Sequence, residues 1–63
     1  MKKKFIPILR DAKEWCDRED KSFPFCQAFL ADQLLEHFPK LTYENAQDIA
    51  YNFLVKELGL PDD

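Results

Sequence analysis

The chain has 63 residues, a formal net charge of −3, a sequence isoelectric point near 5.0 and two cysteines. This length allows one small domain, 1–63, with a thin hydrophobic core and a correspondingly small stability. The acidic residues are spread along the chain, which disfavours binding to the phosphate backbone of nucleic acids, and no apolar run reaches the about 18 residues of a membrane span.

Two cysteines are too few for a disulfide scaffold. No secretory signal precedes them, because the apolar run after Lys4 is short and is broken by Pro7. We therefore expect a cytoplasmic protein with reduced thiols. Cys16 and Cys26 stand on either side of an expected turn and could lie close enough to bridge, so a disulfide stays open as the alternative.

A first helix is expected at 7–18. Pro7 suits its first turn, where the N–H that proline lacks is not needed. The apolar residues follow the i, i+3, i+4 and i+7 spacing of an amphipathic helix, and they are Phe5, Ile8, Leu9, Ala12, Trp15 and Cys16. The remaining positions of this segment are mostly charged, so one side of the helix should face the core and the other should face water.

A second helix is expected at 23–37. The charged stretch 17–22 contains no apolar residue and predicts the turn before it. Ser22 can cap the helix and Pro24 fits its first turn, whereas Pro39 disfavours helical geometry at the residue before it.

This second helix carries apolar residues on two sides. At about 100° per residue, one stripe is expected to face the core, and it consists of Ala28, Leu30, Ala31, Leu34, Leu35 and Phe38. Phe25 and Phe29 fall near the opposite side, beside Asp32 and Glu36. Either Phe5, Ile6 and Trp15 of the first helix cover these two phenylalanines, or the two form an exposed patch that binds another protein or a second copy of the chain.

A third helix is expected at 43–58, with Thr42 as its cap. Gly59 and Pro61 should end it, with Leu60 folding back onto the last turn and Asp62 and Asp63 fraying. Its main apolar stripe consists of Tyr43, Ala46, Ile49, Ala50, Phe53, Leu54 and Leu58. Tyr51 and Val55, together with Leu58, form a second small apolar patch away from that stripe.

No pattern in the chain predicts catalysis or a bound metal. The residues available for nucleophilic catalysis are one serine, one threonine, two cysteines and one histidine. Ser22 and Thr42 are explained as helix caps, and Cys26 and His37 are expected about 16 Å apart on one helix. Two cysteines and one histidine give at most three zinc ligands, at no recognised spacing. We therefore expect a protein that is not an enzyme and has no cofactor or metal.

A helix-turn-helix DNA-binding regulator is the first alternative, because three short helices can present the third one to a DNA groove. The expected exposed residues of that helix argue against it, since they include three acids and one base, which phosphate would repel. They are Glu44, Asn45, Gln47, Asp48, Asn52, Lys56 and Glu57.

One segment, 34–41, has the sequence LLEHFPKL and is similar to the Phe-Pro loop of CUE and related ubiquitin-binding three-helix domains. The methionine that usually precedes Phe-Pro in those domains is His37 here. The match covers less than a fifth of the chain, and we interpret it as local loop chemistry, a proline after an aromatic residue between two helices.

The sequence therefore predicts an all-α domain, a small three-helix bundle with helices at 7–18, 23–37 and 43–58. We expect a non-catalytic interaction or regulatory protein, of a size that suits an accessory or inhibitor protein of a mobile element. A structural homodimer is the second alternative. The residues expected to contact a protein partner are Phe25, Phe29, Asp32, Glu36, Tyr51 and Val55.

Overall fold

The computed structural model describes residues 2–58, and the side chains of residues 2–56. A short 3-10 helix, Lys3–Phe5, precedes three α-helices, α1 (Ile6–Arg18), α2 (Phe23–His37) and α3 (Tyr43–Leu58). The described residues contain no strand. The predicted all-α three-helix bundle is confirmed, and its helices begin and end within one residue of the predicted bounds. The expected helix stop at 59–61 and the fraying end at 62–63 lie outside the described residues.

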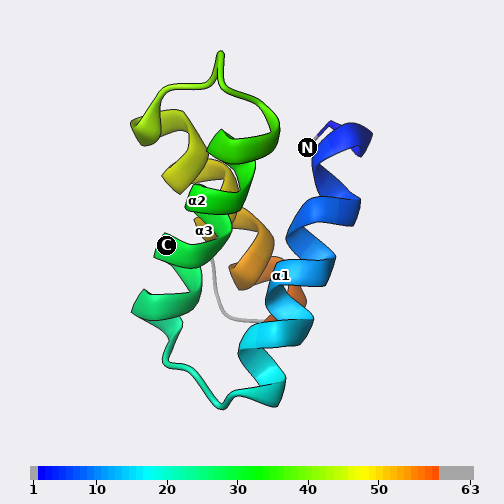
Figure 1. Cartoon of the computed structure of the whole chain (residues 1–63). Coiled ribbons are helices and arrows are strands. Elements are labelled where there is room, and N and C mark those ends of the chain that lie inside the picture. The colour runs from blue at the N-terminus through cyan, green and yellow to red at the C-terminus, as the bar shows by residue number, and fades with distance from the viewer. Residues whose placement is uncertain (1, 59–63) are drawn as a thin grey trace.

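Helix α2 is the central element of the bundle. It packs against both α1 and α3, whereas α1 and α3 have few contacts with each other. Figure 1 shows α1 beside α2 and α3 crossing behind them. The largest side chains that are almost completely buried come from all three helices, and they are Leu9, Cys16, Leu30, Leu34 and Leu54. A single core therefore holds the three helices together.

The N-terminus of the bundle differs from the sequence prediction. The backbone N–H of Phe5 donates to the carbonyl of Lys2 at 3.1 Å, which forms a tight turn before α1 begins. This turn buries Phe5 edge-on against Phe38, with the ring centroids 5.0 Å apart. The ammonium group of Lys4 lies over both rings, at 5.5 and 5.4 Å from their centroids. The start of the chain is thus packed against the end of α2.

The predicted caps of α2 and α3 are present. The Ser22 hydroxyl accepts a hydrogen bond from the Phe25 N–H at 3.4 Å, and the Thr42 hydroxyl accepts one from the Asn45 N–H at 3.1 Å. Each hydroxyl satisfies one of the backbone donors that the first turn of a helix leaves free. The ends of both helices are therefore determined locally by their own sequence.

Between α2 and α3, the side-chain amide of Gln27 donates to the amide oxygen of Gln47 at 3.2 Å. Both residues are partly buried. The surrounding interface is apolar, and none of the described buried residues is polar or charged.

The turn between α1 and α2 is a Schellman motif. The N–H of Asp20 donates to the carbonyl of Asp17 at 3.2 Å, and the N–H of Lys21 donates to the carbonyl of Cys16 at 3.0 Å. Asp20 has a φ of 55°, the left-handed conformation in which a motif of this kind usually has glycine. Because Asp20 has a Cβ atom, this turn carries backbone strain.

Replacement of Asp20 by glycine is therefore expected to stabilise the protein by about 0.5 kcal/mol. Relief of a strain of about 1 to 2 kcal/mol is partly offset by the larger backbone entropy of glycine in the unfolded chain. Asp20→Ala is the matched control, which keeps the Cβ atom and should not stabilise. Thermal and urea unfolding of the two variants measure this difference, and equal stabilities would contradict the strained turn.

Candidate functional site

The candidate site is built at the turn between α1 and α2, where three aromatic rings meet. Trp15 of α1 lies against Phe29 of α2, with ring centroids 4.9 Å apart, and stacks on Phe25 at 6.4 Å. Phe25 and Phe29 stack on each other at 6.4 Å. We call these three residues the aromatic corner. It joins the two helices by contacts that are worth about 0.5 to 1.5 kcal/mol per pair beyond burial.

Lys21 lies over the aromatic corner. Its ammonium nitrogen is 5.0 Å from the centroid of Phe25 and 5.8 Å from that of Trp15. Its backbone carbonyl accepts a hydrogen bond from the Cys26 thiol at 3.7 Å, and its N–H closes the Schellman turn. In most Schellman motifs an apolar residue at this position packs on the preceding helix. Here a lysine covers the rings and keeps its charge in water.

The sequence left open whether the first helix covers Phe25 and Phe29. In the structure, α1 covers Phe29 more completely than Phe25. Phe29 is partly buried and packs against the core, with Trp15 as its neighbour in α1. Phe25 remains 44% exposed although one side of its ring contacts Trp15. The apolar surface that is left for a partner is therefore smaller than the two-residue patch, and it centres on Phe25.

The predicted polar neighbours of this patch are placed as expected. Asp32 and Glu36 are exposed on α2. At about 100° per residue they lie on the same side of the helix as Phe29, on its solvent side. The ion pair of the described residues, between Lys13 and Asp17 at 2.8 Å, involves neither of them.

The predicted patch on the third helix is corrected by the structure. Tyr51 is 39% exposed, and its ring packs edge-on against Phe23 with centroids 5.9 Å apart. Val55 is only 6% exposed, so it does not belong to an exposed surface. Helical periodicity gives the side of α3 on which Val55 lies, but it does not tell which other parts of the chain cover that side. Tyr51 of α3 contacts Phe23, whereas Phe25 contacts Trp15 and Phe29.

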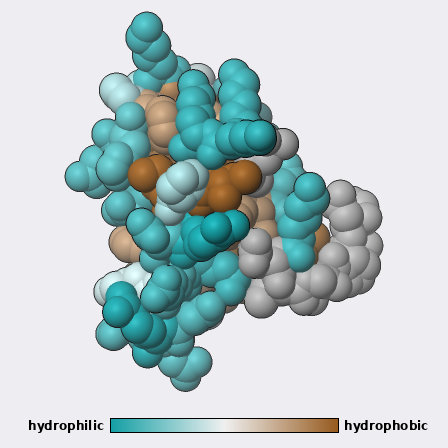
Figure 2. All heavy atoms as spheres, turned by 90° about the vertical axis from the view of Figure 1, so that its right-hand side faces the viewer, coloured by the Kyte–Doolittle hydropathy of each residue, from teal (hydrophilic) through white to brown (hydrophobic). Residues whose placement is uncertain are grey.

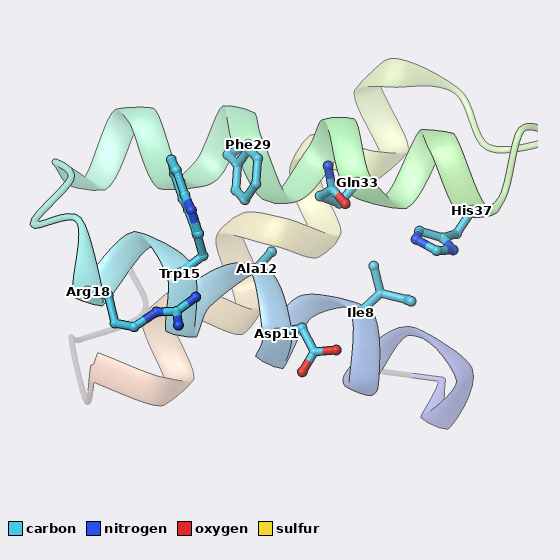
Figure 3. Close-up of a pocket in the computed structure, with 8 residues that line it drawn as sticks. All are labelled: Ile8, Asp11, Ala12, Trp15, Arg18, Phe29, Gln33 and His37. Atoms are coloured by element: carbon cyan, nitrogen blue, oxygen red, sulfur yellow. The ribbon is translucent and has the colours of Figure 1, made fainter.

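A groove of about 360 Å³ runs from the aromatic corner between α1 and α2 (Figure 3). Its apolar lining consists of Ile8, Ala12, Trp15 and Phe29. Its polar lining consists of Asp11, Arg18, Gln33 and His37. Five of these residues come from α1, and the three residues of α2 follow one another at a spacing of four, so the groove follows the two helix axes.

Figure 2 views the molecule from the right-hand side of Figure 1, where α1 lies, and shows a small apolar area beside hydrophilic side chains.

Sequence reasoning named Trp15 only as a residue of the first helix that would cover Phe25 and Phe29, and it did not assign Lys21, Gln33 or His37 to the site. A signal for Trp15 was present, because an antiparallel helix pair brings together residues at similar distances from the turn. Trp15 precedes Asp20 by five residues and Phe25 follows it by five. No sequence signal indicated that Lys21 would lie over the rings.

Cys16 and Cys26 are free and buried, and His37 is exposed at the groove. Within the described part of the chain, no three histidine, cysteine, aspartate or glutamate residues are grouped so that they could hold a metal ion. No helix among the described residues is long and apolar enough to cross a membrane.

The thiol of Cys16 is held in its protonated form. Burial, and then a hydrogen bond and the charge of the neighbouring Cys26, raise the pKa of Cys16 from 9.0 to about 12. The thiolate is the reactive form of cysteine, and very little of it exists at neutral pH when the pKa is this high.

No protein-family model, curated protein or solved structure matches this chain significantly. The site must therefore be interpreted from its own residues.

Serine substitutions at the two phenylalanines should have unequal effects on stability. Phe29→Ser is expected to cost about 3 kcal/mol or more, the range for a core aromatic residue, whereas the half-exposed Phe25→Ser should cost about 1.5 kcal/mol or less. Urea unfolding followed by circular dichroism measures both variants. Similar losses above about 3 kcal/mol would show that Phe25 is an ordinary core residue.

The native protein should react slowly with a thiol reagent at mildly alkaline pH. Because Cys16 is buried and protonated, its modification requires opening of the helix pair, and we expect it to be at least about a hundredfold slower than in the denatured chain. Absorbance of the released aromatic thiol measures the rate, with the denatured protein as the control. Equal rates in the two states would contradict the burial of the cysteine pair.

Proposed function

We propose that this protein is a small non-catalytic interaction module that binds a protein partner through the aromatic corner and the adjoining surface of α2. The observation that carries the proposal is that the Phe25 side chain stays 44% exposed although Trp15 and Phe29 pack against its ring. An aromatic ring that is held rigid by its neighbours loses little entropy when it binds, and aromatic residues are enriched at the centres of binding surfaces.

The surroundings of Phe25 support this function. Trp15 and Phe29 fix the orientation of the ring, and Asp32 and Glu36 supply exposed polar groups nearby. A partner that covers Phe25 would also desolvate the side of Trp15 that faces the groove. The role of an accessory or inhibitor protein, which needs only a binding surface, is compatible with this arrangement.

The described exposed residues of α3 do not favour the DNA-binding alternative. They include Glu44 and Asp48 but a single base, Lys56. Such a surface repels the phosphate backbone. A homodimer would use the same aromatic corner on both copies, and the oligomeric state in solution separates it from binding to another protein.

Site-specific photocross-linking tests the proposal. A photoreactive phenylalanine analogue at position 25 should give a discrete cross-linked product in the native host, and the same analogue at Tyr43, which is exposed on α3, should not. Mass spectrometry of the product identifies the partner. A product that contains only this chain would indicate a homodimer, and the absence of any product specific to position 25 would contradict the interaction surface.

A further inference from the structure

The groove between α1 and α2 runs along the two helices and could accommodate a third helix from another protein. Its lining residues come from α1 and α2, and α3 lies behind this pair of helices (Figure 3). From Ile8 to Arg18 the α1 side of the groove extends about 15 Å at 1.5 Å per residue, which corresponds to about three helical turns. An extended peptide would need backbone partners for its N–H and C=O groups, and the backbones of α1 and α2 have already used theirs. A helix has no such need.

The charges around this groove favour one kind of helix. Asp11 lines the groove on the α1 side, and Asp32 and Glu36 are exposed on the α2 side. Among the described residues none of the three takes part in an ion pair. Arg18 is the one basic residue of the lining and stands at the end near the turn. The middle of the groove is therefore flanked by acids on both sides.

We propose that this groove binds an amphipathic helix of the partner protein, one whose apolar stripe is flanked by lysine or arginine. The inference rests on the proposed function and adds the class of partner. The apolar stripe would contact Ile8, Ala12 and the Trp15–Phe29 pair, and the flanking cations would lie beside Asp11, Asp32 and Glu36. Such complementarity contributes to specificity and to the rate of association.

Other occupants fit the groove less well. The apolar stripes of α1, α2 and α3 in a second copy are already buried in its own core. An anionic membrane surface and nucleic acid would both be repelled by the acidic flanks.

The experiment uses two synthetic helices of about three turns that share one leucine stripe. One has lysines beside the stripe and the other has glutamates. Trp15 is the single tryptophan of the chain and lines the groove, so its emission reports binding directly. The lysine helix is expected to bind and to shift this emission, and the glutamate helix should bind at least about tenfold more weakly.

Two charge-reversal variants provide the matched comparison. Asp32→Lys with Glu36→Lys removes the acidic flank, whereas Glu44→Lys with Asp48→Lys makes the same change in net charge on exposed positions of α3. The first variant should weaken binding of the lysine helix about tenfold, and the second should weaken it less than about twofold. Circular dichroism and thermal unfolding verify that both variants are folded.

Equal binding of the two helices, equal effects of the two variants, or no binding at all would overturn the assignment of a basic helix to the groove. The photocross-link at position 25 distinguishes this failure from failure of the proposed function. If that cross-link forms and the lysine helix does not bind, the interaction surface stands and the occupant is of another kind.

Discussion

Helix α2 has to bury apolar side chains toward both α1 and α3, and this requirement governs the rest of the structure. Leu30, Ala31 and Leu34 are buried in the shared core, while Phe29 turns toward Trp15 of α1. A helix with two neighbours needs a wide apolar arc, so most of the apolar surplus of this segment is explained by folding alone. Only the part that neither neighbour covers, at Phe25, is available for binding. The candidate site is thus the edge of the core, and the same residues that hold α1 in place also orient the exposed ring.

The turn between α1 and α2 connects local backbone geometry to the aromatic corner. The left-handed conformation of Asp20 directs the chain back along α1, and Lys21 follows it directly. As a result the Lys21 side chain reaches over Trp15 and Phe25, while its carbonyl meets the Cys26 thiol. A small strain in one residue is retained because the contacts on both sides of it depend on that geometry. The corner that we propose as a binding surface is therefore held by backbone as well as side-chain contacts.

Local sequence signals predicted the helices well, but they could not predict contacts between segments that are distant in the chain. The caps Ser22 and Thr42 act within the first turns of α2 and α3, and Pro7 and Pro24 act within the first turns of α1 and α2. The N-terminal ends of the helices could therefore be placed from the sequence. The 3-10 turn before α1 and the lysine over the rings depend on packing between segments that are distant in the chain. Val55 shows the same limit, because periodicity gives a direction around one helix but not what lies there. The candidate site was half predictable for this reason: Phe25 and its possible neighbour Trp15 were named from the sequence, whereas Lys21 and the groove between α1 and α2 were not.

The hydrogen bond between Gln27 and Gln47 has a consequence for how uniquely the bundle is assembled. Apolar contacts have little directional preference, so a helix that slides along its neighbour by one turn exchanges some of them for others at modest cost. The amide pair cannot be exchanged in this way, since both groups are partly buried and each would lose its partner. This hydrogen bond joins α2 to α3. It therefore favours the observed alignment of α3 on α2 over alignments that would leave both amides without a partner.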